Sequence, residues 1–189
     1  LSHIVLYSPV GFDSESQLII MMFEKFWFMY NRDYQVKLLG FLDTESVDEL
    51  LINRPKLFTA SRTWESLTPY ILNRPLKMNK GTIDKKCKDV DTYKALVSEV
   101  YKELSLRKMP EPDEVRVIEG GNSLIGARQI QWSDFIRIRY RDTGVYNLKA
   151  DDNASEGYGF RIRFRERVSG PISIGGCCHF GMGLFRSVP

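Results

Sequence analysis

Arginines alternate with apolar residues in two short segments, 136–141 and 160–167, and this spacing could bind a chain of phosphates. Alternation with a period of two puts the arginines of a strand on one face and its apolar residues on the other. A guanidinium is planar and presents several N–H donors that hydrogen-bond to phosphate oxygens. Each phosphate that it neutralises releases a counterion, which favours binding. We therefore expect two strands with an RNA-binding face formed by Arg137, Arg139, Arg141, Arg161, Arg163, Arg165 and Arg167.

The alternative is a solvated sheet face on which acidic side chains neutralise these arginines. Asp134, Asp142 and Glu166 lie close enough in the sequence to pair with them. The distribution of arginine favours anion binding, because it supplies 4 of the 13 basic residues in 1–94 but 11 of the 14 in 95–189. Two such strands in one chain favour RNA, which basic and aromatic sheet faces commonly bind.

Histidine is the natural general acid or base near neutral pH, and the chain has only two histidines, His3 and His179. A single histidine more often has a structural role than a catalytic one. So few histidines exclude a His-rich metal site, and the adjacent Cys177 and Cys178 lack metal-ligand spacing. We interpret these cysteines as small buried residues rather than nucleophiles.

The segment 170–183 is rich in glycine, and Gly175 and Gly176 could bring backbone N–H groups close to a phosphate. The alternative is a tight turn before the last strand. The sequence lacks the strand–GxxxxGK–helix pattern, which excludes a nucleotide-hydrolysing P-loop.

Two other segments could contact RNA. Residues 61–65 predict a polar loop in which Arg62 and Trp64 touch RNA, or in which the tryptophan only anchors the loop to the core. Between Lys77 and Lys88 the composition predicts a basic loop. Its candidate RNA-binding residues are Lys77, Lys80, Lys85 and Lys86.

The composition is that of a globular protein. The 189 residues are 43% hydrophobic and 27% charged, and the net charge is only +3. The most apolar run, 18–29, contains Glu24 and Lys25 and is shorter than the roughly 18 residues that a membrane-spanning helix needs. We expect a cytoplasmic protein with no membrane contact.

Hydrophobic periodicity predicts the elements of the N-terminal part. We expect a buried strand over 3–7, a helix over 17–30, a strand over 34–42 and a short helix from Ser46 through Leu51. A strand over 68–72 follows in a less regular segment.

The clearest helix begins at Asp91 or Thr92 and continues through Leu104. A strand over 115–118 and a turn at Gly120 precede the arginine strands. The chain is therefore predicted to be α+β, with helices on one face of antiparallel sheets. We expect ferredoxin-like units over 1–55 and 91–189, joined by an irregular basic connection over 56–90.

The stretches 61–72, 170–176 and 179–185, together with the opening 3–12, resemble the processing half of Csb-type CRISPR proteins of type I-U, also called I-G, systems. These are members of the RAMP superfamily. The sequence departs from the pattern at Asn73-Arg74-Pro75, where a histidine-containing stretch is expected. The start at Leu1 predicts a piece of a larger fused subunit.

The resemblance implies an endoribonuclease that binds CRISPR repeat RNA or guide RNA and cuts it without metal or cofactor. The 2′-hydroxyl of a ribose would attack the adjacent phosphate and leave a 2′,3′-cyclic phosphate. His3 is the first candidate for the general base, His179 the second and Tyr7 a weaker one, with Arg62 as a transition-state cation. Other subunits of a type I surveillance complex are the implied protein partners.

Two other functions stay open. A member of the same superfamily could bind RNA in a surveillance complex without cutting it. A third class is a scaffold that binds no RNA, in which Arg137, Arg139, Arg161 and Arg163 pair with acids of a partner protein.

Overall fold

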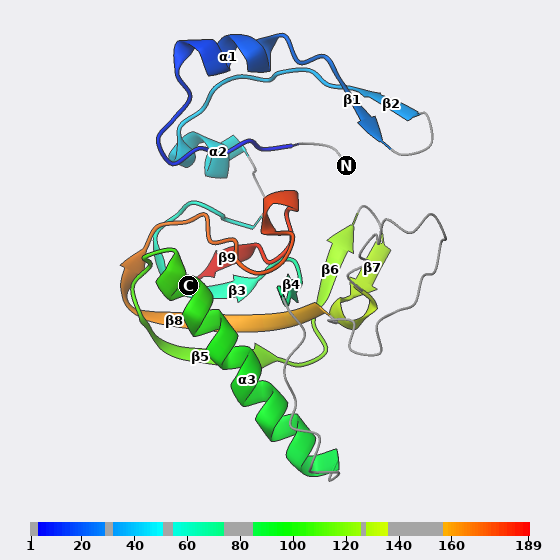
Figure 1. Cartoon of the computed structure of the whole chain (residues 1–189). Coiled ribbons are helices and arrows are strands. Elements are labelled where there is room, and N and C mark those ends of the chain that lie inside the picture. Colours follow the sequence, from blue (N-terminus) through cyan, green and yellow to red (C-terminus); the bar gives the residue numbers. More distant parts are fainter. Residues whose placement is uncertain (1–3, 29–31, 51–54, 74–84, 126–127, 136–156) are drawn as a thin grey trace. The chain divides into compact units, whose positions relative to one another are not determined.

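The computed structural model describes residues 4–28, 32–50, 55–73, 85–125, 128–135 and 157–189 (Figure 1). Its contacts divide the chain into two units, Leu1–Asp43 and Thr44–Pro189. The boundary therefore falls at Asp43 and not at the predicted residue 55. Of the residues that carry sequence predictions, His3, the lysines 77 and 80 and the segment 136–156 with its arginine strand lie outside the described residues.

The first unit contains the helix α1 (Ser14–Met21) and the antiparallel hairpin of β1 (Lys25–Phe28) and β2 (Arg32–Gln35). The Asp13 side chain caps α1 by accepting a hydrogen bond from the Ser16 N–H. The prediction of one helix over 17–30 is wrong after Met21. The aromatic residues that follow favour a strand, and here they pair in the hairpin.

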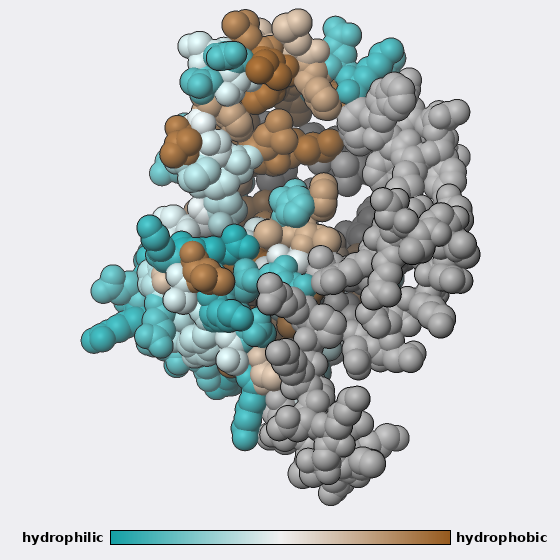
Figure 2. Space-filling view, in the orientation of Figure 1, coloured by the Kyte–Doolittle hydropathy of each residue, from teal (hydrophilic) through white to brown (hydrophobic). Residues whose placement is uncertain are grey.

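Two other predictions fail in this unit. Residues 4–7 are not a buried strand, since they form no regular element and Ile4, Val5 and Leu6 are exposed. The predicted strand over 34–42 ends at Gln35. The apolar residues at the surface of this unit are visible in Figure 2.

The second unit begins with α2 (Thr44–Leu50), which confirms the predicted short helix. The Asp48 carboxylate accepts hydrogen bonds from the N–H groups of Leu57, Phe58 and Thr59 and from the Thr59 hydroxyl. Partial burial alone would raise the pKa of Asp48, but these hydrogen bonds outweigh it and hold the pKa below its usual value. Asp48 thus ties α2 to the chain that leads into the sheet.

The remaining elements build a sheet, a long helix and a small hairpin. They are β3 (Ser61–Ser66), β4 (Tyr70–Ile71), α3 (Lys85–Leu106), β5 (Pro112–Ile118), β6 (Asn122–Ile125), β7 (Arg128–Gln131), η1 (Trp132–Asp134), β8 (Gly157–Val168), η2 (Cys178–Phe180) and β9 (Phe185–Val188). Within 56–90, the predicted irregular connection, lie the strands β3 and β4 and the start of α3.

The long strand β8 is the centre of the sheet (Figure 1). It pairs with β5 on one side and with β3 on the other, β9 pairs with β3, and the two-residue β4 pairs with the beginning of β8. All these pairings are antiparallel. The strand order is β5-β8-β3-β9, so β8 lies between β3 and β5, which the chain connects through β4 and α3. This confirms the predicted α+β class with an antiparallel sheet.

The hydrophobic core is formed by one face of this sheet, α3 and the segment 170–176. The predicted helix over 91–104 is confirmed, and it begins earlier, at Lys85. Lys85 and Lys86 therefore belong to a helix and not to a basic loop. The fully buried side chains of the core include Trp64, Leu96, Val100, Phe160, Ile162, Phe164, Ile172, Ile174 and Phe185.

Among the described residues, no helix is long and apolar enough to cross a membrane. The 22-residue helix α3 has the length but carries many charged side chains.

Candidate nucleic-acid interface

The register of the sheet places charged side chains from four strands on the face away from the core. Arg116 of β5 lies opposite Arg161 of β8, which lies opposite Glu65 of β3, which lies opposite Arg186 of β9. Directly opposite residues point to the same side of a sheet, so these side chains form one row across it.

A second row lies two residues along β8. Glu114 of β5 is opposite Arg163, and Arg163 is opposite Thr63 of β3. Because Arg161 and Arg163 are two residues apart on one strand, both rows share a face. We call this surface the arginine face, and it consists of Glu65, Glu114, Arg116, Arg161, Arg163 and Arg186.

Each glutamate of the arginine face is shared by two arginines. Glu65 forms ion pairs with Arg161 and, at 3.4 Å, with Arg186. Glu114 forms ion pairs with Arg116 at 2.6 Å and with Arg163 at 3.8 Å. Four arginines against two glutamates leave a charge of +2 on the face.

The sequence-based prediction for β8 is confirmed. Phe160, Ile162 and Phe164 are buried, whereas Arg161, Arg163, Arg165 and Arg167 are exposed. The register against β3 shifts after Arg163, where β8 carries extra residues, and Arg165 lies in this bulge. Among the described residues Arg165 has no hydrogen-bond or ion-pair partner, while Arg167 donates to the Ala60 carbonyl at 3.0 Å.

The acids that pair with β8 differ from those expected from the sequence. Glu65 and Glu114 take this role in the part of the chain that the structure describes, and neither Asp134 nor Glu166 forms an ion pair there. Asp142 lies outside the described residues. The partners come from strands far away in the sequence, so only the register could reveal them.

The tryptophan of η1, Trp132, closes one end of the exposed sheet surface. A Cβ atom added to Gly159 would lie 1.6 Å from the Trp132 ring, and one added to Gly121 would lie 1.9 Å from it. The indole therefore packs directly on these two glycines and is itself buried. Gly159 lies two residues before Arg161 on β8, so the arginine face begins beside this ring.

The predicted loop over 61–65 is wrong, because these residues form β3. Alternation in Thr63-Trp64-Glu65 sends the tryptophan into the core and the glutamate to the arginine face. Trp64 is completely buried, and its indole N–H donates to the Ser61 carbonyl at 3.2 Å. It anchors the core and is not accessible to a base, whereas Arg62 is exposed.

The glycine-rich segment does not present a nest of free N–H groups at Gly175 and Gly176. Both residues are buried, and the Gly176 N–H donates to the Ile71 carbonyl at 2.6 Å. A Cβ atom on Gly175 would lie 2.7 Å from the Tyr70 ring. These glycines allow the segment to pack tightly against β4, which matches the alternative of a turn before the last strand.

Of the three predicted proton-transfer residues, only His179 lies in the unit that carries the arginine face. His179 is exposed in η2, and its ring is tilted against that of Phe180 with a centroid distance of 4.1 Å. Tyr7 belongs to the first unit, and His3 lies outside the described residues. No described contact joins His179 to the arginine face.

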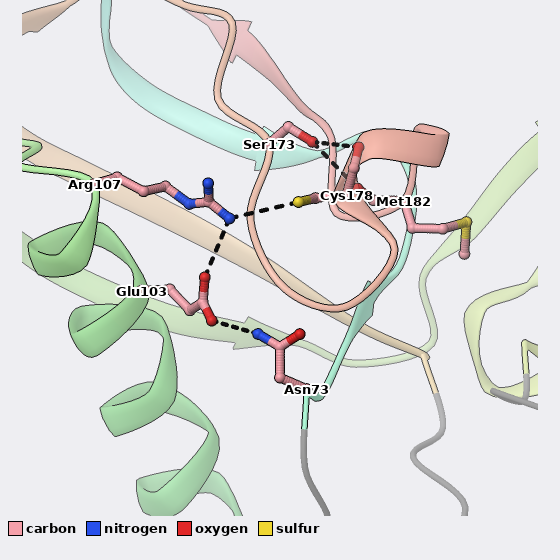
Figure 3. Close-up of polar contacts among 6 residues, drawn as sticks. All are labelled: Asn73, Glu103, Arg107, Ser173, Cys178 and Met182. Atoms are coloured by element: carbon pink, nitrogen blue, oxygen red, sulfur yellow. Dashed lines mark hydrogen bonds and ion pairs between the residues drawn. The ribbon is translucent and has the colours of Figure 1, made fainter. Parts of the chain in front are cut away.

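Next to His179, Cys178 joins a polar cluster on the α3 side of the sheet (Figure 3). Arg107, the residue after α3, donates to the Cys178 sulfur at 3.5 Å and pairs with Glu103 of α3 at 3.2 Å, and Asn73 donates to Glu103 at 2.5 Å. Cys177 and Cys178 are half-buried free thiols. The cluster fastens η2 to the C-terminal end of α3.

No family model, curated protein or solved structure matches the chain. Within the described ranges, no group of three or more His, Cys, Asp or Glu side chains is arranged to hold a metal ion. Function must therefore be inferred from the residues themselves, and the arginine face is their most distinctive arrangement.

Proposed function

We propose that this chain binds single-stranded RNA by its phosphates on the arginine face. The observation that carries the proposal is the outward row of arginines from three strands, in excess over the two acids that they share. Arg165 adds a further exposed guanidinium at the end of β8. Like charges placed opposite each other, as Arg116 and Arg161 are, destabilise a sheet, which argues for an anionic ligand.

The topology supports the same function. One strand between two strands that a helix connects is the split βαβ arrangement of ferredoxin-like folds. We therefore propose a ferredoxin-like unit built on β3, α3, β5, β8 and β9, in which the glycine-rich segment stands where the second helix is expected. RNA-recognition domains of this kind bind single strands on the exposed face of the sheet.

The spacing of the arginines along β8 suits an extended single strand. Residues two apart on β8 are about 7 Å apart, which is comparable with the separation of successive phosphates in an extended strand. The exposed aromatic residues that stack bases in many RNA-binding sheets are absent from the described arginine face. Recognition would therefore rest on phosphates and on stacking of guanidinium planes, with little dependence on base sequence.

Fluorescence anisotropy with short labelled RNA tests the proposal. We expect binding to single-stranded RNA that weakens as salt rises, and weaker binding to an RNA duplex of the same sequence. A preference for single-stranded DNA would support binding on the arginine face, but would identify DNA rather than RNA as the ligand. Equal affinity of the wild type and an Arg163→Ala/Arg165→Ala variant would contradict the proposal.

Cleavage of CRISPR repeat RNA is a second proposal, and it follows from the resemblance of the sequence to the Csb-type proteins. One observation favours it: the exposed imidazole of His179 is able to exchange a proton with a ligand. Labelled repeat RNA incubated with the protein and EDTA should yield a 2′,3′-cyclic phosphate, and His3→Ala and His179→Ala should identify the catalyst. Tight binding without product would leave the RNA-binding function and reject the nuclease.

A further inference from the structure

We infer that Glu65 and Glu114 are positioning residues that organise the arginines into two phosphate clamps. This inference rests on the proposed function. Each carboxylate lies between two guanidinium groups from different strands, and together they connect all four arginines of the face.

The first clamp is built around Glu65. Arg161 donates to Glu65 through Nε at 2.7 Å and through a terminal nitrogen, and Arg186 approaches the other carboxylate oxygen from β9. The two arginines lie on opposite sides of β3, which carries Glu65. Without this acceptor their like charges would turn them away from each other.

The second clamp is built around Glu114. The Glu114 carboxylate accepts from Arg116 Nε at 2.6 Å on its own strand and pairs with Arg163 across the strand boundary. Arg163 has no other described acidic partner. Glu114 is therefore the acid that draws the guanidinium of Arg163 toward β5.

The carboxylates lie deeper than the guanidinium groups that they hold. The side chains of Glu65 and Glu114 are 16% and 31% exposed, whereas those of the four arginines are 45% to 70% exposed. A phosphate that approaches from solvent meets the arginines first and has no need to displace a carboxylate. An arginine has five N–H donors, so those not used by glutamate remain for phosphate.

The two clamps are spaced for a strand that crosses the sheet obliquely. β3 and β5 flank β8, and the glutamates differ by one two-residue step along it. From the strand spacing and rise, their backbone positions are about 12 Å apart, or roughly two phosphate steps of an extended strand. We infer that one RNA strand engages both clamps over β8.

Substitutions Glu65→Gln and Glu114→Gln test the inference, with Glu166→Gln as the control. Each of the three variants loses one negative charge, so its net charge rises by one. In the described structure Glu166 is exposed on β8 and forms no ion pair. If the glutamates position the arginines, the first two variants bind RNA about two- to tenfold more weakly in spite of their added charge. The salt slope should fall by about 0.7 for each phosphate that a variant no longer neutralises. Glu166→Gln should bind at least as tightly as the wild type.

Each outcome decides a different point. Equal or tighter binding of both glutamine variants would overturn the positioning role, because the glutamates would then act only as negative charges. If the glutamine variants bind normally but Arg163→Ala/Arg165→Ala binds RNA more weakly, the positioning role is wrong and the proposed function still holds. Thermal unfolding of each variant checks that it is folded. If Glu65→Gln unfolds, Glu114→Gln on the edge strand β5 still tests the inference.

Discussion

The two faces of the sheet are made by the same strands and differ in what holds their side chains in place. On one face Phe160, Ile162 and Trp64 are buried under α3 and the glycine-rich segment. On the other, Arg161 and Arg163 are exposed and held by shared carboxylates. The buried face provides stability by removing apolar surface from water, and the exposed face gains little stability from its ion pairs.

This difference implies that stability and binding are separable in this domain. Substitutions on the buried face should unfold the chain, and substitutions on the arginine face should change its ligand affinity and leave the fold intact. In order of decreasing effect on stability, Phe160→Ala tests the buried face and Arg163→Ala the exposed face, and substitutions at Gly183 and Asp48 fall between them.

Phe160→Ala should destabilise the second unit by about 3–5 kcal/mol, because it leaves a cavity in the core. Phe160 is fully buried, and its ring packs edge-on against Tyr70 at a centroid distance of 5.2 Å. Urea unfolding followed by circular dichroism measures the loss. A loss below about 1 kcal/mol would mean that this face of β8 is not the core.

Gly183→Ala should destabilise by about 1–3 kcal/mol, whereas Gly181→Ala should cost less. Both glycines have positive φ, +58° and +84°, but an added Cβ meets the Ile174 carbonyl oxygen at 1.8 Å only at Gly183. Gly181→Ala measures the cost of placing a side chain at a positive φ, and Gly183→Ala adds the cost of the close contact with Ile174. Equal thermal shifts in the two variants would show that the close contact contributes nothing.

Asp48→Asn should lower stability by about 1–2 kcal/mol at neutral pH, since it weakens hydrogen bonds to a charged acceptor. The pKa of Asp48 is lowered in the folded state, so its contribution is present above the unfolded pKa and is lost as pH falls through the folded value. The stabilities of variant and wild type should therefore begin to converge as the pH falls below about 4. A difference that persists unchanged in acid would contradict the role of the charge.

Arg163→Ala should change the free energy of unfolding by less than about 1 kcal/mol, as expected for an exposed ion pair. The same variant should bind RNA more weakly. Urea unfolding and anisotropy on one preparation compare both effects. A large loss of stability would show that the arginine face is structural, and the separation of the two faces would be wrong.

Sequence periodicity predicted both faces of β8, the helix α3 and the α+β class, because each depends on local alternation or helical spacing. It could not predict the register. Glu114 and Arg116 alternate with Val115, but nothing local shows that they lie opposite Arg163 and Arg161. Arg186 follows the buried Phe185, and nothing local shows that it lies opposite Glu65. Long-range pairing also explains Trp64: a polar segment became a central strand once β8 and β9 lay beside it.

The N-terminal predictions failed for a related reason. The apolar run after Gln17 fits a helix by composition, yet its aromatic residues pair as a hairpin. The glycine-rich segment shows the same limit, because its glycines are explained by contacts with Tyr70 and Ile174 and not by an anion. Local sequence alone did not distinguish a close backbone contact from a phosphate site.

The most direct test of the arginine face is the salt dependence of RNA affinity in two charge-matched double variants. Arg163→Ala/Arg165→Ala removes two charges from β8, and Lys94→Ala/Lys102→Ala removes two from exposed positions of α3. We predict that the arginine variant binds single-stranded RNA more weakly, with a salt slope smaller by about 1.4, and that the lysine variant keeps the wild-type slope. Equal slopes for the two variants would contradict binding on the arginine face.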